Sequence, residues 1–355
     1  MDDVQDERGD AAPVVLVIDG NSLVHRSFHA QARTASHTAD GRPCWAVRGL
    51  LMQLVAAVDR IRPAAVVVGF DDPGKSVRRD RWPTYKATRV DKLDSLIDQL
   101  QCAVEVLREL GVAVVVPPGL EADDVLASTA AQAARLGATA VVVTSDRDAF
   151  ALIDDTTRVL RIINGGVEAS PLMNADRLVM LLGIRPEQYR DYAALRGDPS
   201  DNLPGVRGIG PRTAARLLQE FGSAAAAFAD RDAVRTKFGA GLAAKLADPA
   251  ARAAWELNCQ VMTMHADVPM DLDLVAGPGV LPLPADAVAR VFREHQLVWS
   301  VNEALCVLAS ADPDRLEQPR APLPSWIEPS DGFARPRLPK LPARRPEPAQ
   351  LSLFD

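Results

Sequence analysis

The first half of the chain alternates between short, uninterrupted apolar runs and longer segments in which apolar residues recur every three or four positions. Uninterrupted apolar runs are typical of parallel strands buried on both faces. The wider spacing, as in Leu50, Leu54 and Val58, is typical of an amphipathic helix. Strands alternating with helices predict an α/β fold with a mostly parallel sheet. We predict strands at 14–20, 64–70, 112–116, 140–144 and 158–163, and helices at 48–60, 92–110 and 125–136.

The pattern changes near residue 170. From there to about residue 308 the chain has no strong strand signal, so we predict a mainly helical region. Beyond residue 310 it is rich in Pro and basic residues and poor in apolar ones, which is typical of disorder. The helices of the second region are expected at 174–182, 186–195, 211–221 and 241–246. The expected parts are a disordered N-terminus (1–13), an α/β domain (14–180), a helical domain (181–309) and a disordered tail (310–355).

Composition narrows the class of protein. The 355 residues are 48% hydrophobic and 25% charged, which fits a globular chain of two domains. No apolar run approaches the ~18 residues that span a bilayer, and the acidic start lacks the features of a signal peptide. The four scattered cysteines predict reduced thiols in a cytoplasmic protein. A net charge of −7 has the wrong sign for a nucleic-acid partner, unless clustered carboxylates hold cations.

Acidic residues directly follow four of the predicted strands. In an open α/β sheet, ligands bind at the edge where the strands end. A single Asp at such a position is commonly a turn or cap residue. Four strand ends that bring carboxylates to one edge instead indicate a site for a hard divalent cation. These acids are Asp19, then Asp71, then Glu121, Asp123 and Asp124, and finally Asp146 and Asp148.

The stretch from Glu121 to Asp124 has two interpretations when it is taken by itself. Three neighbouring carboxylates repel one another, and a divalent cation would remove that conflict. Alternatively, they form a solvated acidic helix start, with Asp123 or Asp124 as the capping residue. The acids at the other strand ends favour the metal site.

The segment between Pro73 and Arg89 is basic, carries Trp82 and Tyr85, and has little apolar periodicity. Cations combined with aromatic rings are the composition that proteins use to follow a single nucleic-acid strand. We therefore interpret the segment as a mobile excursion from the edge that carries the acids. The alternative is a solvated surface loop.

A glycine-rich turn in the second region leads into a predicted helix. Gly205, Gly208 and Gly210 precede Pro211, which suits the first position of a helix. Such a turn at a helix start binds anions, and Arg207, Arg212 and Arg216 add positive charge. The pattern is typical of a helix-hairpin-helix that grips a duplex phosphate backbone, the alternative being an ordinary packing element. Asp198 and Asp201, just before it, are placed to close the metal site.

The chain ends in Gln350-Leu351-Ser352-Leu353-Phe354-Asp355. Apolar residues at the tip of a predicted disordered tail have no core to join. Such a segment is typical of a docking peptide.

In their order, these stretches resemble the 5′-nuclease (flap endonuclease) family, and above all the N-terminal 5′→3′ exonuclease domains of bacterial DNA polymerase I. The resemblance runs from about residue 14 to about residue 308. Three positions depart from the family pattern: His25 replaces a common Tyr, Arg48 replaces an aromatic residue, and a Pro-Met-Pro run is missing after Arg89. The motifs are VIDGNS at 17–22, FHA at 28–30, VGFD at 68–71, YK at 85–86, EADDV at 121–125, TSDRD at 144–148 and GDPSDNLPGVRGIG at 197–210.

The resemblance implies a site for two divalent cations, Mg²⁺ or Mn²⁺. One cation would be held by Asp19, Asp71, Glu121 and Asp123, and the other by Asp123, Asp146, Asp148 and Asp201, with Asp124 and Asp198 in the outer sphere. Lys86, Arg78 and Arg89 would face the scissile phosphate. Phe28 and Tyr85 would contact DNA near the site. A monovalent cation such as K⁺ is also implied on the carbonyl groups of Val206 to Ile209.

The implied fold is a PIN-like, mostly parallel α/β sheet with a helical arch at about 72–95. A helical domain with a helix-hairpin-helix (H3TH) at about 197–221 would follow. The implied activity is that of a structure-specific 5′ nuclease that cuts DNA at 5′ flaps, nicks and 5′ ends, and removes RNA primers. Because no polymerase domain follows in the sequence, we expect a free-standing nuclease, and we expect it to be a monomer. The residues Gln350, Leu351, Leu353 and Phe354 resemble a peptide that binds the bacterial sliding clamp.

Two other functions fit parts of the pattern. A non-catalytic DNA-junction binder would use the hairpin and the tail, but it would gain nothing from so many carboxylates near DNA. A metal-dependent phosphatase or nucleotidase would use the carboxylates, but neither the basic segment nor the hairpin.

Overall fold

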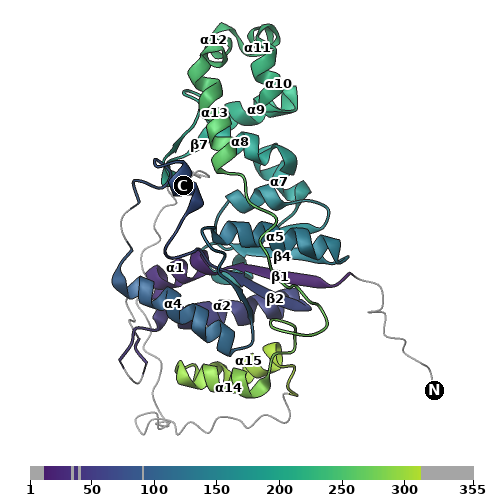
Figure 1. The fold of residues 1–355 in the computed structure, drawn as a ribbon. Coiled ribbons are helices and arrows are strands. Elements are labelled where there is room, and N and C mark those ends of the chain that lie inside the picture. Colours follow the sequence, from purple (N-terminus) through teal and green to yellow (C-terminus); the bar gives the residue numbers. More distant parts are fainter. Residues whose placement is uncertain (1–11, 33–35, 39–40, 90–91, 313–355) are drawn as a thin grey trace, which may run out of the picture. The chain divides into compact units, whose positions relative to one another are not determined.

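The computed structural model describes residues 12–32, 36–38, 41–89 and 92–312. Its centre is a six-stranded sheet with the strand order β3-β2-β1-β4-β5-β6 (Figure 1). Neighbouring strands are parallel except β6, which runs antiparallel to β5. The predicted α/β fold with a mostly parallel sheet is confirmed. The strands are β1 (Val14–Asp19), β2 (Ala65–Gly69), β3 (Ala113–Val115), β4 (Thr139–Thr144), β5 (Thr157–Arg161) and β6 (Leu172–Met173).

The register of the strands decides where the acids come together. Asp19 of β1 pairs with Gly69 of β2, and Ile18 of β1 pairs with Val143 of β4. The C-terminal ends of these three strands therefore lie side by side. Because the strands are parallel, the residues that follow them emerge at one edge of the sheet.

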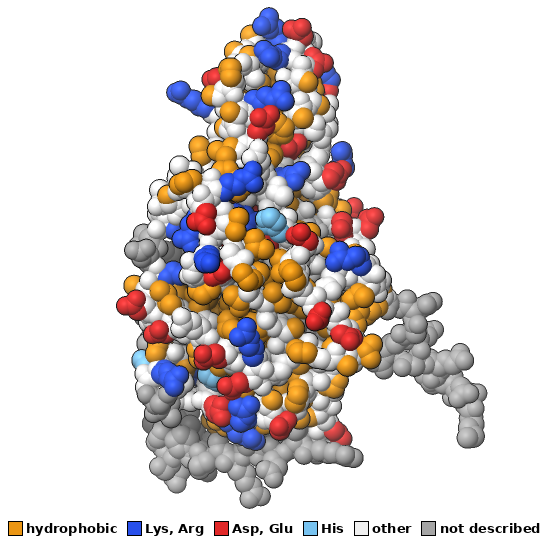
Figure 2. Space-filling view, viewed as in Figure 1, with side chains coloured by type: hydrophobic (Ala, Val, Ile, Leu, Met, Phe, Trp, Pro, Cys, Tyr) orange, Lys and Arg blue, Asp and Glu red, His pale blue; other side chains and the backbone are white. Residues whose placement is uncertain are grey.

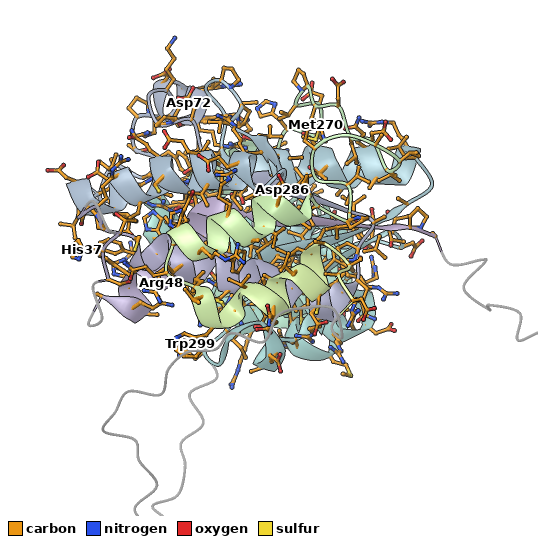
Figure 3. All side chains as sticks on the ribbon, turned by 90° about the horizontal axis from the view of Figure 1, so that it is seen from below. His37, Arg48, Asp72, Met270, Asp286 and Trp299 are labelled. Carbon is orange, nitrogen blue, oxygen red and sulfur yellow. The ribbon has the colours of Figure 1, made fainter. Side chains whose placement is uncertain are left out.

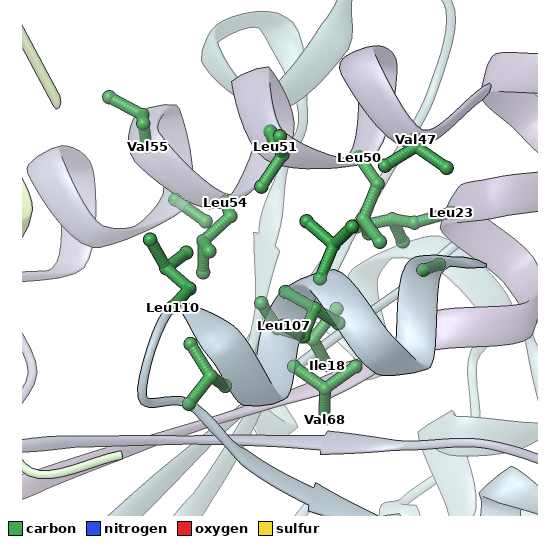
Figure 4. Close-up of a cluster of buried hydrophobic side chains, with 14 of the residues drawn as sticks. Ile18, Leu23, Val47, Leu50, Leu51, Leu54, Val55, Val68, Leu107 and Leu110 are labelled. Carbon is green, nitrogen blue, oxygen red and sulfur yellow. The ribbon is translucent and has the colours of Figure 1, made fainter. Parts of the chain in front are cut away.

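One face of the sheet is covered by α1 (Gly20–Gln31), α2 (Trp45–Ile61) and α4 (Asp94–Glu109). Figure 4 shows this core, in which Leu50 and Leu54 of α2 lie close to Leu107 of α4, above the strands. The helix α1 is not among the predicted helices. Its buried side includes Gly20 and Ser27, which give no apolar signal.

The other face of the sheet is covered mainly by α5 (Ala122–Arg135). Val125 and Leu126 of α5 share a core with Val17 of β1 and Val142 of β4. The helix starts three residues earlier than predicted, so that Asp123 and Asp124 lie in its first turn. A 3₁₀ helix, η1 (Asp148–Leu152), follows β4 on the same side.

Part of the region expected to form one helical domain from 181 to 309 packs on the first region. Its last helices, α14 (Ala285–Glu294) and α15 (Val301–Leu308), share the core of α2 and α4 through Val288, Phe292 and Leu305. In Figure 3 these two pale green helices lie across that helical layer, with Asp286 on α14. Trp299, in the 3₁₀ turn η4 (Val298–Ser300), is 75% exposed. The apolar spacing of α14 and α15 predicted helices but not the surface on which they pack.

The remaining elements form the helical region and its connections (Figure 1). The segment from 72 to 89 contains one short helix, α3 (Val77–Arg81). The predicted helices at 174–182 and 211–221 are confirmed to within one residue. The elements are α6 (Gly166–Ala169), α7 (Ala175–Leu182), η2 (Pro186–Gln188), α8 (Tyr189–Arg196), β7 (Gly197–Asp198), η3 (Pro199–Asp201), β8 (Leu203–Pro204), α9 (Pro211–Phe221), α10 (Ala224–Ala229), α11 (Arg231–Phe238), α12 (Ala240–Ala247) and α13 (Pro249–Val261).

Within the described ranges, no helix is both long enough and apolar enough to cross a membrane. All four cysteines lie in these ranges, and none forms a disulfide. The predicted docking peptide at 350–354 lies outside the described residues, as do nearly all of the two segments expected to be disordered.

Candidate active site

Asp19 and Asp71 lie next to each other at the ends of β1 and β2, and neighbouring groups fix both side chains. Asp19 caps α1, accepting from the Ser22 N–H at 2.8 Å, and also accepts from Thr144 Oγ1 at 2.7 Å. Asp71 accepts from Asn21 Nδ2 at 2.8 Å and from the N–H of Ala122, at the start of α5, at 2.9 Å. These contacts join the ends of β1, β2 and β4 to the start of α5.

Asp146 and Asp148 follow β4 in a tight turn. The N–H of Asp146 donates to Thr144 Oγ1 at 3.0 Å, and Asp146 Oδ1 accepts from the N–H of Asp148 at 2.9 Å. The Oδ1 atom of Asp148 is buried and has no hydrogen-bond partner. A buried carboxylate oxygen without a donor is costly unless a cation or water reaches it.

The three acids at the start of α5 have different environments. Glu121 is the N-cap residue, and Asp124 accepts from the N–H of Glu121 at 2.9 Å. The alternative of a solvated start capped by Asp123 or Asp124 is therefore wrong: Glu121 is the capping residue, and both Glu121 and Asp124 are buried. Asp123 is half-buried and takes no part in this cap.

Arg78 and Asp124 form a buried ion pair. Arg78 Nη1 and Nη2 each donate to one carboxylate oxygen of Asp124, both at 2.7 Å, and Asp124 is fully buried. The same guanidinium donates to the carbonyl oxygens of Val261 and Thr263. With its donors used in this way and only 6% of its surface exposed, Arg78 is not placed to face a scissile phosphate. Its place is structural: it anchors the base of the segment 72–89 to α5 and to the end of α13.

Tyr85 and Lys86 converge on Glu121. Its Oε2 atom accepts from the Tyr85 hydroxyl at 3.0 Å and from Lys86 Nζ at 3.1 Å. Lys86 has a φ of 56°, in the left-handed region that a residue with a side chain seldom adopts. Its N–H donates to the carbonyl oxygen of Asp201 at 2.9 Å, which holds this conformation.

Of the two predicted acids in the second region, Asp201 contacts the basic segment and Asp198 does not. Arg89 Nη2 donates to Asp201 Oδ1 at 2.5 Å, and Asn202 Nδ2 donates to the carbonyl oxygen of Thr84. Asp198 instead caps the turn of η3, accepting from the N–H of Ser200 at 2.8 Å. Lys86 thus connects Glu121 with the backbone of Asp201, and Arg89 contacts the Asp201 side chain.

The carboxylates repel one another. Burial, followed by the charges of Asp71 and Asp146, raises the pKa of Asp19 to about 7. Burial and the charges of Asp146, Asp198 and Asp201 raise the pKa of Asp148 to about 7. Burial together with Asp146 and Asp19 raises the pKa of Asp123 well above its usual value.

Asp124 is the exception among the acids. Burial opposes its ionisation, but the hydrogen bonds and charge of Arg78 outweigh burial and lower the pKa of Asp124. Asp124 is therefore already neutralised by the chain, whereas Asp19, Asp123 and Asp148 are not.

This donor set fits hard divalent cations. Its members are carboxylates whose charge the chain leaves largely uncompensated, and one of their oxygens is buried without a donor. As they stand, no three His, Cys, Asp or Glu side chains of the described residues are arranged as a metal centre. The assignment therefore rests on the chemistry and electrostatics of the carboxylates.

The structure places the predicted DNA-binding residues in different surroundings. Phe28 is only 4% exposed and packs on Trp45, with ring centroids 5.1 Å apart, so it presents no free face for stacking. Tyr85 is only 5% exposed and contacts Glu121. Arg216 lies over the ring of Phe238, 5.1 Å from its centroid.

In the hairpin, Arg207, Gly208, Gly210 and Arg212 are exposed, and Gly205 is half-buried. The helices α9–α13, at the top of the view in Figure 2, carry Lys and Arg side chains interspersed with acidic ones. The charge of this region is therefore mixed over that face.

Sequence patterns did not assign roles to several residues that shape the site. Asn21 bridges to Asp71, and Thr144 contacts both Asp19 and the N–H of Asp146. The Ser22 and Ser145 hydroxyls lie 2.5 Å apart. These residues sit beside the acids in the motifs, but their partners are distant in sequence, and only the fold reveals the pairs.

Two family models match the chain. A model of the 5′-3′ exonuclease N-terminal resolvase-like domain matches residues 14–180, and a model of the 5′-3′ exonuclease C-terminal SAM fold matches residues 184–278. The chain belongs to the 5′-3′ exonuclease family. DNA polymerase I of Mycobacterium tuberculosis is 38% identical over 304 residues, which cover 85% of this chain and 32% of that protein. DNA polymerase I of Thermus aquaticus is 36% identical over 259 residues, 73% of this chain and 29% of that protein. The chain thus spans about a third of the length of these relatives.

Solved structures share the fold. The T5 5′-exonuclease with bound divalent metal ions (zinc) superimposes with a TM-score of 0.58 at 16% identity, covering 81% of this chain and 99% of that one. The catalytic core of Rad2 in complex with a DNA substrate gives a TM-score of 0.53 at 19% identity, covering 84% and 92%. At 16% and 19% sequence identity, these similarities show only that this chain shares the fold of those proteins.

The pair of Arg78 and Asp124 gives a test of stability. Replacing Arg78 with Met leaves the Asp124 charge buried and unpaired, so we expect the free energy of unfolding to fall by about 3–5 kcal/mol. The exposed neighbour provides the control: Arg79→Met should change it by no more than about 0.5 kcal/mol. Urea denaturation in EDTA measures both. Wild-type stability of Arg78→Met would show that the pair does not hold the segment in place.

The repulsion among the acids gives a pH test. Because the folded pKa of Asp148 is raised, the folded protein binds this proton more tightly than the unfolded one. The stability that follows is present below about pH 4 and is lost as the pH rises to about 7. In EDTA, the Asp148→Asn variant should therefore have a higher melting temperature than the wild type at pH 8.5, and a smaller increase at pH 4.5. Each kcal/mol gained in the free energy of unfolding corresponds to ~2–4 °C. The exposed Asp98→Asn is the control, and an equal gain at both pH values would contradict the assignment.

Proposed function

We propose that this chain is a structure-specific, metal-dependent 5′ nuclease, a 5′→3′ exonuclease and 5′-flap endonuclease that hydrolyses phosphodiester bonds in DNA. One observation carries the proposal: the carboxylates that follow the strands raise one another's pKa values, and Lys86 and Arg89 contact two acids beside them, Glu121 and Asp201. A site of this charge balance suits a polyanionic substrate that arrives together with divalent cations.

The carboxylates divide into ligands and supports. Asp19, Asp71, Glu121, Asp123, Asp146, Asp148 and Asp201 would hold two Mg²⁺ or Mn²⁺ ions, with Asp198 in the outer sphere. Asp124 would act only through Arg78, since both of its oxygens already accept hydrogen bonds. Bound divalent cations would supply an activated water and stabilise the leaving oxygen, which is the usual role of paired metals in phosphodiester hydrolysis.

The cationic side chains would bind and orient the phosphate. Lys86 Nζ is shared with Glu121 at 3.1 Å and is half-buried, so its charge is held at the edge of the carboxylates. There it would stabilise negative charge that develops on the scissile phosphate. The more exposed Arg89 would bind an adjacent phosphate. Because Lys86 is also held by the backbone of Asp201, a substrate bound by the helical region would be aligned with the same lysine.

Specificity would come from two surfaces. Arg207, Gly208, Gly210 and Arg212, at the start of α9, would hold a duplex through its phosphates. The basic segment 73–89 would receive the free 5′ strand, which includes the ends of RNA primers. The buried Phe28 and Tyr85 would support the site from beneath without stacking on bases, and Arg216 would contact DNA only after leaving Phe238.

The test uses a 5′-labelled double-flap DNA and an unpaired linear single strand, each with Mg²⁺, Mn²⁺ or EDTA. We expect metal-dependent cutting at the flap junction and little cutting of the single strand. The Asp146→Asn variant should not cut the flap DNA but should still bind it in Ca²⁺, whereas the Asp98→Asn variant should cut at the wild-type rate. Cutting by Asp146→Asn at the wild-type rate would contradict the metal assignment. Binding without cutting in either metal would favour the DNA-junction binder.

We also propose that the terminal residues Gln350, Leu351, Leu353 and Phe354 bind the sliding clamp of the replication machinery. The proposal is supported by three large apolar side chains within a basic, Pro-rich sequence. Replacing Leu353 and Phe354 with Ala should abolish the chain's binding to a purified clamp in a pull-down, while flap cutting by the chain alone stays unchanged. Unchanged clamp binding by that variant would contradict the proposal.

A further inference from the structure

The hairpin before α9 has a cation of its own. Lys245, in the last turn of α12, donates from Nζ to the carbonyl oxygen of Gly208 at 3.2 Å. The two residues are 37 positions apart in the chain, so the contact is made by the fold. Lys245 was not singled out by any sequence pattern.

The ammonium group of Lys245 lies directly against Gly208 of the turn. Gly208 has a φ of +77°, and a Cβ atom at this position would collide with the ammonium group and the side-chain carbons of Lys245. The backbone conformation therefore favours a glycine at 208, and a side chain there would have to push the ammonium group of Lys245 aside. Val206 and Ile209, on either side, are buried at 3% exposure and anchor the turn.

Three carbonyl groups of the turn already have donors. Val206 O accepts from the N–H of Ile209 at 2.9 Å, Gly208 O accepts from Lys245, and Gly210 O accepts from the N–H of Ala214 at 3.0 Å. The family resemblance implies a monovalent cation on the carbonyl groups of Val206 to Ile209, and a cation bound to that of Gly208 would have to displace the ammonium of Lys245. The residues present therefore do not fit a K⁺ ion at Gly208.

The positive charge of Lys245 is not balanced by a neighbouring acid among the described residues. Among the described residues it makes no ion pair, and its side chain is exposed. Lys237, on the neighbouring α11, is also exposed, but it is paired with Glu220. An ammonium has three donors, and one bond to Gly208 leaves two for a phosphate oxygen.

We propose that Lys245 is the cation of this hairpin: its ammonium group takes the position of a bound monovalent ion and binds the DNA phosphate held at the start of α9. The inference rests on the proposed function, because it requires that the hairpin binds duplex DNA. It follows that duplex binding does not depend on which monovalent cation is in solution. The lysine acts as a positioning and binding residue for the duplex, away from the scissile bond.

The experiment measures binding of the full chain to a fluorescent double-flap DNA by anisotropy in EDTA. Titrations are done at equal ionic strength in KCl and in tetramethylammonium chloride, whose cation is too large for a carbonyl site. We expect the wild type to bind with the same Kd in both salts, within about twofold. Lys245→Gln should bind about tenfold more weakly, which is ~1.4 kcal/mol. Lys245→Arg should stay within about twofold of the wild type, because it keeps the charge and the donors.

Lys237→Gln is the matched control and should bind like the wild type, and thermal melting of Lys245→Gln should confirm that it is folded. The proposal is overturned if the affinity of the wild type for the flap DNA falls several-fold when tetramethylammonium chloride replaces KCl. It is also overturned if the Lys245→Gln variant binds the flap DNA as tightly as the wild type. A wild-type chain that binds no flap DNA in either salt would contradict the proposed function itself, which keeps the two failures distinct.

Discussion

The repulsion among carboxylates at the C-terminal edge of the sheet is the constraint on which the rest of the structure depends. Burial and mutual proximity raise the pKa values of Asp19, Asp123 and Asp148. Such a group of acids is tolerated only where cations offset the charge. The chain supplies part of that offset through Lys86, and in the proposed function divalent ions would supply the remainder. The same arrangement that costs stability therefore creates the site.

Two arginines of the basic segment carry the same charge but differ in burial and in the contacts they make. Arg78 is buried on Asp124 and fixes the base of the segment to α5 and to the end of α13. Arg89 is exposed and contacts Asp201, at the entrance of the helical region. Because Lys86 lies between them and is held by the backbone of Asp201, the geometry of the site depends on both regions of the chain. Any movement of the turn at 198–202 would be transmitted to Lys86.

In the hairpin, too, a side chain of the protein offsets a local partial charge. A helix start favours an anion, and the carbonyl groups of the preceding turn favour a cation. At Gly208 the chain meets the second need with Lys245. The turn and the lysine on α12 thus form one contact, which the proposed function would use to bind DNA.

The sequence by itself determined the α/β class, the parallel strands and the acids that follow them, because buried strands need continuous apolar runs and each acid sits directly after one. It also marked the glycine turn and the start of α9 at Pro211. Only the tertiary structure decided which charges are paired. The burial of Arg78 and Phe28, the contact of Lys245 with Gly208, and the packing of α14 on the first region all join residues far apart in the chain. Sequence patterns record local period and residue type, whereas burial and ion pairing depend on which distant segments the fold brings into contact.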